Sequence, residues 1–373
     1  MVIVRETDRS EREADLHRGD QRQAMGTGVV TGFAGHAVYM TRRGGPDVLE
    51  VRERHVPLPG PGEVVVEIRA TGVAYGDQKS REGLKPGMHF PSIPGYDGAG
   101  VVVAVGAGVI EPVVGTHVAV WTGGSGGNAS HVTVPSWAAV GYPAEMSSET
   151  VASMILTYLT AYQLLNRAVP VPEGATILVH PAAGTVGTAL LQLGALRGLR
   201  MFGTASASKA HLVSQAGAEP INYRTEDYAR RIRTDGPEGI DAIFDGIGGN
   251  SWRKDLPLLR AGGHLAVYGF TEGVRNGRRN LAGLLRGAIR APRPSYLTYY
   301  LRGVGVTGYR VDETIAAHHD WYAEDMSALI QLLRNGAITP IIHKTFPFRE
   351  AAEAHRELAS GSAGGKILLL PAS

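Results

Sequence analysis

Short apolar runs alternate with longer helical patterns over the middle of the chain, and this alternation constrains the fold more than any other feature of the sequence. The strand patterns lie at residues 176–180, 200–204, 220–222, 240–244 and 264–268, and the helical patterns lie at 186–197, 207–216 and 226–233. Strands joined by helices of this length need crossover connections, which build a parallel sheet with helices on both faces. The sequence therefore predicts a doubly wound α/β domain.

The part of the chain before this domain is rich in strand patterns punctuated by Gly and Pro. Strands are expected at 48–52, 63–70, 100–105, 116–121 and 131–134. In the second of these, Val65 stands between Val64 and Val66, so the strand is apolar on parts of both faces, as in a packed barrel or sandwich. A helix over 151–168 leads out of this region, and helices at 323–334 and 349–360 with a strand at 366–370 close the chain.

The composition excludes several kinds of site and partner. Cysteine is absent from the 373 residues, which excludes disulfides, thiolate zinc sites, iron–sulfur ligation and a cysteine nucleophile. Lys plus Arg total 37 against 35 for Asp plus Glu, so a net charge of +2 favours neither a nucleic-acid partner nor a membrane surface. No apolar run reaches the ~18 residues of a membrane span, so we expect a soluble protein.

The N-terminal residues 1–34 lack the pattern of a folded element. Their first part mixes Arg with Asp and Glu and has no apolar centre, so it is not a signal peptide. We expect residues 1–34 to form a mobile tail, and the protein to be cytoplasmic.

A turn rich in small residues follows the strand pattern at 176–180. Its candidate phosphate-binding residues are Ala183, Gly184, Thr185, Val186 and Gly187. Small residues here let backbone N–H groups and the positive end of the next helix approach a pyrophosphate, and Gly187 lets that helix lie close to the strand. Pro181 occupies the first glycine position of the usual fingerprint, so a purely structural turn is the alternative. Its place after a strand and before a helix favours dinucleotide binding.

The next strand end indicates which dinucleotide is bound. Folds that bind NAD usually place an acid about 20 residues after the glycines, to hold the ribose 2′-OH. Residues 203–209 contain no Asp or Glu, whereas Ser206 and Lys209, with Tyr223 and Arg224 nearby, would accept a 2′-phosphate. NADPH is therefore favoured over NADH. The alternative is that Ser206 caps a helix and Lys209 is solvated.

Several further motifs stand in a recognisable order. They are GGPDVLE at 44–50, PGEV at 61–64, GYDGAG at 95–100, LTAY at 159–162, AAGTVG at 182–187, NYR at 222–224 and AAEAH at 351–355. Together they resemble the medium-chain dehydrogenase/reductase superfamily, and within it the zinc-independent quinone oxidoreductase branch. The resemblance covers residues 37–370.

The resemblance implies a GroES-like β-rich catalytic domain that is interrupted by a Rossmann nucleotide-binding domain. We divide the chain accordingly into a tail (1–34), the first part of the catalytic domain (35–155), the NADP-binding domain (156–312) and the C-terminal part of the catalytic domain (313–373). A homodimer is the usual form of this family.

The motifs argue against a catalytic zinc. Zinc-dependent relatives carry a cysteine where this chain has Ala74, and a histidine where it has Tyr96. A zinc site would lose its thiolate and imidazole together, so we expect no metal. Without a metal, reduction of a conjugated double bond or quinone fits best, because hydride from the coenzyme leaves negative charge on a carbonyl oxygen.

The resemblance places the loop at 74–79 against the nicotinamide, and its candidate catalytic residues are Tyr75, Asp77 and Lys79. Tyr75 is the expected acid, because a neutral phenol can hydrogen-bond an enolate, although it could equally form a wall of the pocket. Asp77 is expected to organise the loop. Lys79 could bridge to a phosphate or point to water.

The remaining candidate coenzyme contacts follow other strands or lie on the connecting helix. They are Thr160, Gly246, Gly248, Tyr268, Gly269 and Phe270. Tyr158 is a further residue that could line the site. Each of them also has an ordinary packing or turn explanation.

Residues 273–311 hold eight Arg and no Asp or Glu, interleaved with Tyr296, Tyr299 and Tyr300. A solvated basic loop or interface is the favoured interpretation. Recognition of a CoA or carrier-bound thioester, or of single-stranded RNA, is the alternative. The resemblance puts this segment near the substrate mouth and the dimer edge.

Three functional hypotheses follow. The first is an NADPH-dependent, metal-independent reductase of an enone or quinone. The second is a non-catalytic NADPH-binding protein with an RNA or protein partner, suggested by Ala74, where many relatives carry Asn, and by the basic segment. The third is an enoyl-thioester reductase.

Overall fold

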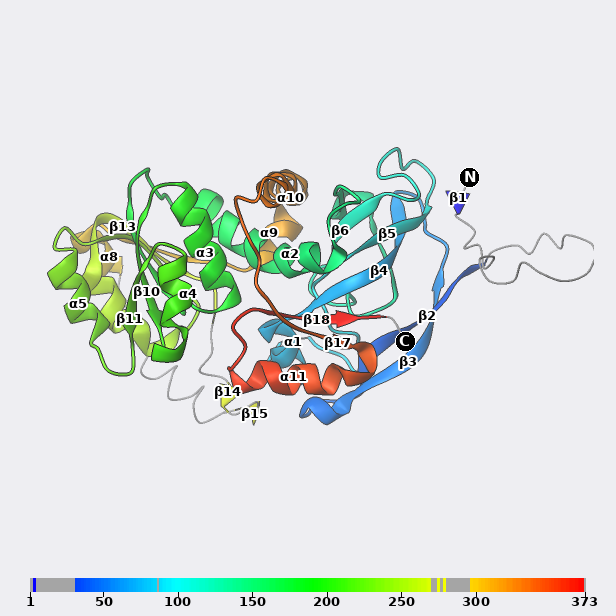
Figure 1. Cartoon of the computed structure of the whole chain (residues 1–373), viewed down its shortest axis with the longest axis horizontal. Coiled ribbons are helices and arrows are strands. Elements are labelled where there is room, and N and C mark those ends of the chain that lie inside the picture. Colours follow the sequence, from blue (N-terminus) through cyan, green and yellow to red (C-terminus); the bar gives the residue numbers. More distant parts are fainter. Residues whose placement is uncertain are drawn as a thin grey trace, which may run out of the picture.

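The computed structural model describes residues 3–4, 31–85, 87–269, 274–275, 278–279 and 296–371. These residues form two large sheets that lie side by side, with the parallel sheet on the left of Figure 1 and the mostly antiparallel sheet on the right. The predicted combination of a GroES-like β-rich part and a Rossmann-like parallel sheet is confirmed.

The parallel sheet has the strand order β11-β10-β9-β12-β13-β16, and every neighbouring pair is parallel. Its strands are β9 (Thr176–His180), β10 (Arg200–Ala205), β11 (Glu219–Asn222), β12 (Ile240–Asp245), β13 (Leu259–Val267) and β16 (Gly305–Gly308). The order reverses between β9 and β12. In such sheets ligands bind at the carboxyl ends of the strands beside this switch point.

Helices cover both faces of this sheet. They are α3 (Thr185–Leu196), α4 (Ala210–Gln215), α5 (Tyr228–Asp235), α6 (Trp252–Asp255) and α8 (Tyr296–Arg302). Ile177 of β9 belongs to the core that contains α3, whereas its neighbour Leu178 belongs to the core that contains α5. Successive side chains of a strand point to opposite faces, so apolar residues in succession are what a doubly covered sheet requires.

The second sheet has the order β17-β18-β4-β5-β6-β8, with β7 paired to β4 and β1 paired to β5. Its strands are β1 (Ile3–Val4), β4 (Glu63–Val73), β5 (Asp97–Val105), β6 (His117–Trp121), β7 (His131–Pro135), β8 (Ala139–Gly141), β17 (Ile342–Pro347) and β18 (Lys366–Leu370). Because β18 pairs antiparallel with β4, the C-terminal segment completes a sheet that the N-terminal half began.

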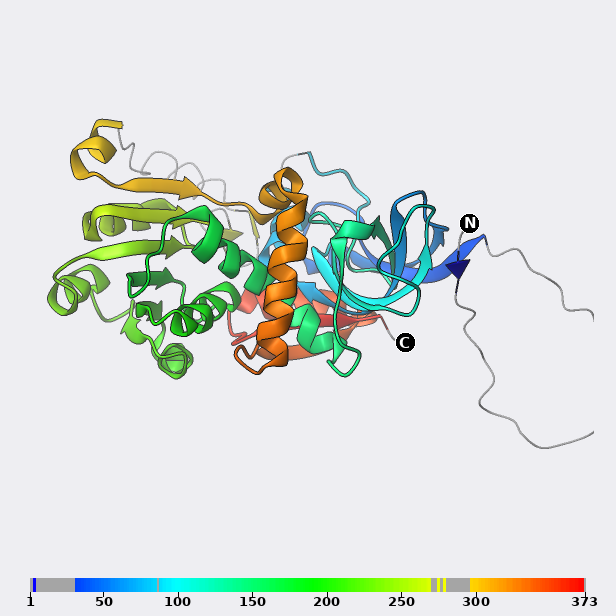
Figure 2. The ribbon, with the colours of Figure 1, turned by 90° about the horizontal axis from the view of Figure 1, so that it is seen from above.

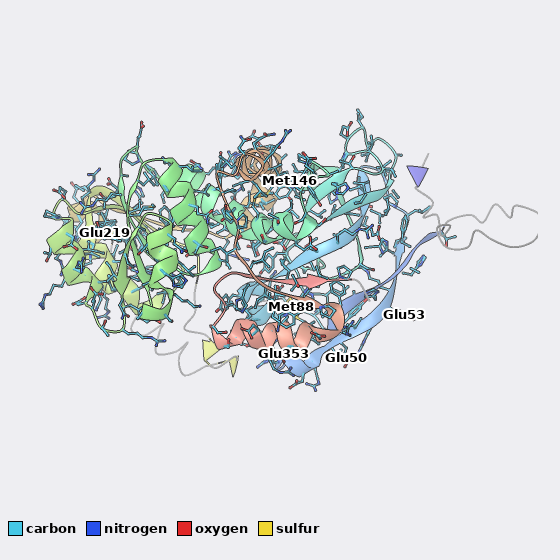
Figure 3. The ribbon with its side chains drawn as sticks, viewed as in Figure 1. Glu50, Glu53, Met88, Met146, Glu219 and Glu353 are labelled. Carbon is cyan, nitrogen blue, oxygen red and sulfur yellow. The ribbon has the colours of Figure 1, made fainter. Side chains whose placement is uncertain are left out.

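A two-stranded ribbon and a short helix flank this sheet. β2 (Gly32–Met40) pairs with β3 (Leu49–Pro57), and the short helix η1 (Pro46–Val48) lies between them. The exposed Glu50 and Glu53 of β3 lie at the opposite end of the molecule from Glu219 of β11 (Figure 3). Helix α1 (Tyr75–Arg81) follows β4 directly.

Helix α2 (Ser148–Gln163) joins the two halves. The Ser147 side chain accepts a hydrogen bond from the Thr150 backbone N–H at 3.2 Å, so the helix begins three residues earlier than predicted. It ends in a π-helical turn at Leu164–Ala168. The predicted domain boundary at 155–156 falls within α2, whose buried side chains belong to one core that includes residues of both sheets.

The C-terminal helices are α9 (Val311–Ala317), α10 (His319–Arg334) and α11 (Ala351–Ser360). Figure 2 shows α10 lying across the junction between the two halves. None of the helices among the described residues is long and apolar enough to span a membrane.

Part of the predicted tail belongs to the fold. Ile3 and Val4 pair with the end of β5, and β2 already starts at Gly32, because its nine residues pair in register with all nine of β3. Residues 1–2 and 5–30 lie outside the described residues.

Candidate functional site

In the turn between β9 and α3, only glycine fits at position 187, where the start of α3 packs against the backbone of the turn. A Cβ on Gly187 would collide with the carbonyl oxygen of Pro181 and lie 2.6 Å from that of Ala182. A Cβ on Gly184, the N-cap of α3, would have no neighbour closer than 3.6 Å. The first turn of a helix leaves its N–H groups without helical partners, and here they belong to Thr185, Val186 and Gly187. This turn fits a pyrophosphate.

The end of β10 carries hydroxyls and a cation but no carboxylate. Ser206 lies at the N-cap position of the following turn without a capping hydrogen bond from its side chain, and its Oγ is 3.1 Å from that of Ser208. The Lys209 Nζ donates to the carbonyls of Gly361 at 2.8 Å and Ala363 at 2.7 Å. Lys209 is therefore not simply solvated, as one interpretation of the sequence had it, because it ties α4 to the loop after α11.

Beside this strand end, Tyr223 is half-exposed and the Arg224 guanidinium lies 5.8 Å from the centre of its ring. Ser206, Lys209 and Tyr223 thus surround a surface that suits a 2′-phosphate. Burial lowers the pKa of Lys209, and one of its three ammonium hydrogens has no protein acceptor among the described residues.

The turns after β12 and β13 pack onto each other at the same edge of the sheet. A Cβ on Gly246 would lie 2.8 Å from the Tyr268 ring, and one on Gly269 would collide with the carbonyl oxygen of Gly246. Gly248 has a φ of +75°, where glycine is favoured. The structure therefore brings these predicted contacts together with the β9 turn. Phe270 lies outside the described residues.

A buried carboxylate that the sequence analysis missed builds the turn after β12. The Asp245 Oδ1 accepts hydrogen bonds from the backbone of Ile247 at 2.7 Å and Gly248 at 3.1 Å, while its Oδ2 accepts from the Ser251 hydroxyl at 2.6 Å. An acid at the end of a strand, directly before a glycine, is the signal that could have found it.

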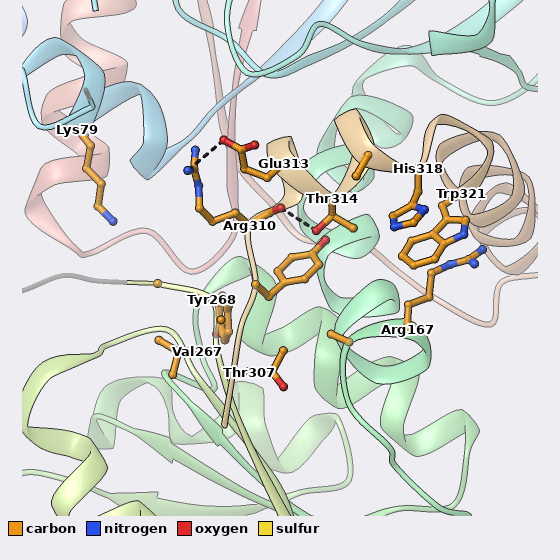
Figure 4. A pocket seen from close by; sticks show the side chains of 15 residues that line it. Lys79, Arg167, Val267, Tyr268, Thr307, Arg310, Glu313, Thr314, His318 and Trp321 are labelled. Atoms are coloured by element: carbon orange, nitrogen blue, oxygen red, sulfur yellow. Dashed lines mark hydrogen bonds and ion pairs between the residues drawn. The ribbon is translucent and has the colours of Figure 1, made fainter. Parts of the chain in front are cut away.

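A cavity of about 800 Å³ opens beside this edge (Figure 4). Its walls come from the carboxyl ends of β13 and β16, from Lys79 of α1, from the end of the π-helical turn and from residues of α9 and α10. β16 and α9 were not expected from the sequence. Thr307 of β16 lines the cavity, and so do Tyr309 and Arg310, the two residues between β16 and α9.

Three cations line this cavity, and two of them are neutralised. Arg167 pairs with Asp325 at 2.6 Å and with Glu324 at 2.8 Å. Arg310 pairs with Asp312 at 2.8 Å and with Glu313 at 3.1 Å. The Lys79 ammonium forms no ion pair or hydrogen bond with any part of the chain that the structure describes, and burial lowers its pKa.

The other two predicted catalytic residues do not line the cavity. Tyr75 is 55% exposed, and its hydroxyl lies 3.5 Å from the carbonyl oxygen of Leu358 on α11. Asp77 is buried, and its two oxygens accept hydrogen bonds from the backbone of Ala74 and Gly95, both at 2.8 Å. Burial raises the pKa of Asp77 to about 6. Asp77 therefore organises the loop, as expected.

Two predicted residues of α2 are buried and hydrogen-bonded within the protein. The Thr160 hydroxyl donates to the Leu156 carbonyl at 2.7 Å, and the Tyr158 hydroxyl donates to Gln192 of α3 at 2.9 Å. Neither residue lines the cavity.

Comparison with known proteins agrees with this architecture. Residues 60–144 match the alcohol dehydrogenase GroES-like domain, and residues 216–369 match a family described as zinc-binding dehydrogenase. The quinone oxidoreductase of Pseudomonas aeruginosa is 35% identical over 334 residues, which are 88% of this chain and 97% of that protein. The chain belongs to the medium-chain dehydrogenase/reductase superfamily, in its quinone oxidoreductase-like branch.

Other members of the superfamily are also similar. The human synaptic vesicle membrane protein VAT-1 homolog is 33% identical over 92% of this chain and 86% of that protein. The crystal structure of Escherichia coli quinone oxidoreductase complexed with NADPH superposes with a TM-score of 0.77 at 27% identity, covering 90% of this chain and 100% of that one.

The residues of this chain do not fit the zinc named in one family description. Asp97, beside Tyr96, is fully buried and accepts hydrogen bonds from the backbone of Gly72 and Leu156, each at 3.0 Å. Both of its oxygens are therefore committed. Across the residues described, no group of three or more His, Cys, Asp or Glu could hold a metal ion.

Proposed function

We propose that this member of the superfamily is an NADPH-dependent reductase that transfers hydride to a carbon–carbon double bond conjugated to a carbonyl, or to a quinone. The observation that carries the proposal is the cavity at the carboxyl ends of β13 and β16. It lies beside the turns in which only glycine fits, and its wall holds the ammonium of Lys79, which no described residue pairs with. The fit of these turns to a dinucleotide supports NADPH as the coenzyme.

The residues that would hold NADPH lie along the sheet edge. The first turn of α3 would hold the pyrophosphate, and Ser206, Lys209 and Tyr223 would hold the 2′-phosphate. Gly246, Gly248 and Gly269 would let the coenzyme pass over the strand ends. Bound NADPH would supply the hydride.

The chain's own contribution is electrostatic. When hydride adds to the β-carbon of an enone, negative charge collects on the carbonyl oxygen, and a proton then completes the reduction. A positive charge held in a partly dry cavity stabilises such an oxygen more than it would in water. Lys79 lines the cavity, so we assign it, in place of Tyr75, whose hydroxyl is turned to α11, the role of balancing negative charge on the acceptor.

The test is NADPH consumption with a panel of enones and quinones and with enoyl thioesters. We expect turnover of free enones or quinones, unaffected by a chelator, and a kcat/KM for NADH about 10-fold or more lower, since one lost charge-assisted contact costs this much. Tight NADPH binding with no turnover on the whole panel would favour a non-catalytic role. Turnover of thioesters alone would favour an enoyl-thioester reductase.

We also propose that the protein forms a homodimer through the edge of the parallel sheet. Among the described residues, β16 is paired on one side only, by β13. The preceding helix α8 exposes Tyr296, Tyr300 and Leu301, which are 83%, 77% and 72% exposed. An unpaired edge beside exposed apolar side chains is a surface that proteins usually cover.

Light scattering after size-exclusion chromatography tests this proposal. The native protein is expected to elute as a dimer, and the Tyr300→Asp/Leu301→Asp variant as a monomer. A monomeric native protein at micromolar concentration would contradict it. Circular dichroism of the variant checks that the monomer is folded.

A further inference from the structure

The cavity wall contains one ammonium, that of Lys79, which has no partner among the described residues. Figure 4 shows the Lys79 side chain reaching from α1 towards the space bounded by Tyr268 and Arg310. The side chain is half-buried, and burial alone accounts for the lowered pKa of its ammonium, with no contribution from a carboxylate.

The carboxylates nearest to Lys79 in the sequence and in the cavity wall are already engaged. Both oxygens of Asp77 accept backbone hydrogen bonds on the inner side of α1. Glu82 accepts a hydrogen bond from Gln78 at 2.9 Å and lies 3.7 Å from the buried guanidinium of Arg81. Glu313 is paired with Arg310. Neither these acids nor any other described residue forms an ion pair with the ammonium.

A half-buried ammonium without a counter-ion gains more from an incoming anion than an exposed one does, because less water competes for it. The partners of the other two cations limit the anion. Each arginine of the cavity is already paired with two acids, so Lys79 is the lining cation that can still take a partner among the described residues. One ammonium suits one carboxylate, whereas the four acids already in this wall disfavour a ligand with several negative charges, such as a phosphate-rich group.

The inference rests on the proposed reductase function. We propose that the acceptor carries its own carboxylate, and that this carboxylate pairs with Lys79 in the cavity. The substrate class is then an α,β-unsaturated carbonyl compound that bears a carboxylic acid. The neutral lining formed by Val267, Tyr268, Thr307 and Tyr309 is left to contact the rest of the molecule.

Two acceptors that differ only in the charge of one group show whether the enzyme recognises the carboxylate or only the activated double bond. trans-4-Oxo-2-pentenoate and its methyl ester have the same activated double bond, and both accept hydride there and a proton on the adjacent carbon. We expect the native enzyme to prefer the acid over the ester in kcat/KM by about 10- to 100-fold, the range expected for one charge-assisted pair. In Lys79→Met this preference is expected to disappear.

Lys344→Met is the control variant. It removes the same charge from the exposed face of β17, where the ammonium lies 4.5 Å from the centre of the Phe346 ring. We expect it to keep the native preference for the acid. An equal loss of kcat/KM for acid and ester in Lys79→Met would show that Lys79 acts on the carbonyl oxygen alone, and would overturn the inference while the reductase function stands.

A binding experiment tests the same site without turnover. Calorimetry would compare 4-oxopentanoate, the saturated acid, with its methyl ester on the complex of the protein with NADP⁺. We expect the acid to bind about 10-fold or more tightly, and Lys79→Met to remove the difference. Equal binding of the two rejects the carboxylate site. Selective binding of the acid, with no reduction of either acceptor, rejects the reductase function instead.

Discussion

Replacing Gly187 with valine is expected to raise the dissociation constant for NADPH at least about 100-fold, which corresponds to about 2.7 kcal/mol. Any Cβ at this position collides with the Pro181 carbonyl and approaches that of Ala182, both in the backbone of the turn. Neither atom belongs to a flexible side chain that could move away. Helix α3 would have to shift from the turn, and its first N–H groups would lose their aim at the pyrophosphate.

Gly184→Ala is the matched control, because it adds a methyl group only three residues away where the nearest atoms are 3.6 Å distant. We expect it to bind NADPH within a few-fold of the native protein. Fluorescence titration with NADPH measures both constants, and circular dichroism reports whether Gly187→Val is folded. If Gly187→Val is unfolded, Gly187→Ala is the smaller change that tests the same collision. Native affinity in a folded Gly187→Val would contradict this account of the turn.

The coenzyme-binding edge could be predicted from the sequence because its chemistry is local. The strand at Thr176–His180 and the helix that follows it are separated by only a few small residues, and these fix the turn. The strand at Lys366–Leu370 was also predicted with its observed bounds. Both strands are runs of apolar residues flanked by glycine or a turn, which is the pattern that a buried strand requires.

β16 and α9 could not be predicted in the same way. β16 consists of Gly305–Gly308, with glycine at both ends and only two other residues, so its own preference for a strand is weak. It is a strand because Leu265 and Ala266 of β13 present their backbone groups to Val306 and Thr307. α9 has only seven residues and no side-chain cap. Tertiary contacts decide such segments.

The partners of the charged side chains in the site could not be predicted from the sequence, for a related reason. Lys209 bonds to carbonyls more than 150 residues away, and Arg167 pairs with acids at a similar separation. Which cation keeps a partner, and which one faces the cavity alone, depends on how α1, α9 and α10 pack. The sequence named Lys79 but could not distinguish it from a solvated lysine.

His355 is expected to make the fold sensitive to acid by about 5 kcal/mol in total. This residue of α11 is fully buried, and neither ring nitrogen has a hydrogen-bond partner among the residues described. Burial, and then the positive charge of Arg81, lower the pKa of His355 from 6.5 to about 3. Between these values the unfolded chain binds a proton that the folded protein does not, so the free energy of unfolding falls by about 1.4 kcal/mol for each pH unit of acidification. Above pH 6.5 the histidine is neutral in both states, so none of this stability is lost there.

Asp77 has the opposite dependence, since its pKa is raised from 3.8 to about 6 and its folded form retains the proton longer. Its contribution to stability is present below pH 3.8 and is lost as the pH rises to about 6. In the native protein the two groups therefore oppose each other over this interval. A variant without His355 should show the Asp77 dependence alone, with the free energy of unfolding falling as the pH rises from about 4 to 6.

His355→Leu isolates the histidine. At pH 8 we expect its free energy of unfolding to stay within about 1 kcal/mol of the native value, because the substitution removes two buried polar atoms without protein partners and replaces the ring with an apolar side chain. As the pH falls from 6.5 to 4, the variant should gain about 3 kcal/mol over the native protein. Urea unfolding at several pH values measures the difference. His343→Leu, which replaces a partly exposed histidine 3.1 Å from Glu357, should not reproduce this gain. A difference between His355→Leu and the native protein that does not change with pH would contradict this account. It would mean that folding does not lower the pKa of His355, and that the α1–α11 contact tolerates a second positive charge beside Arg81 below pH 6.5.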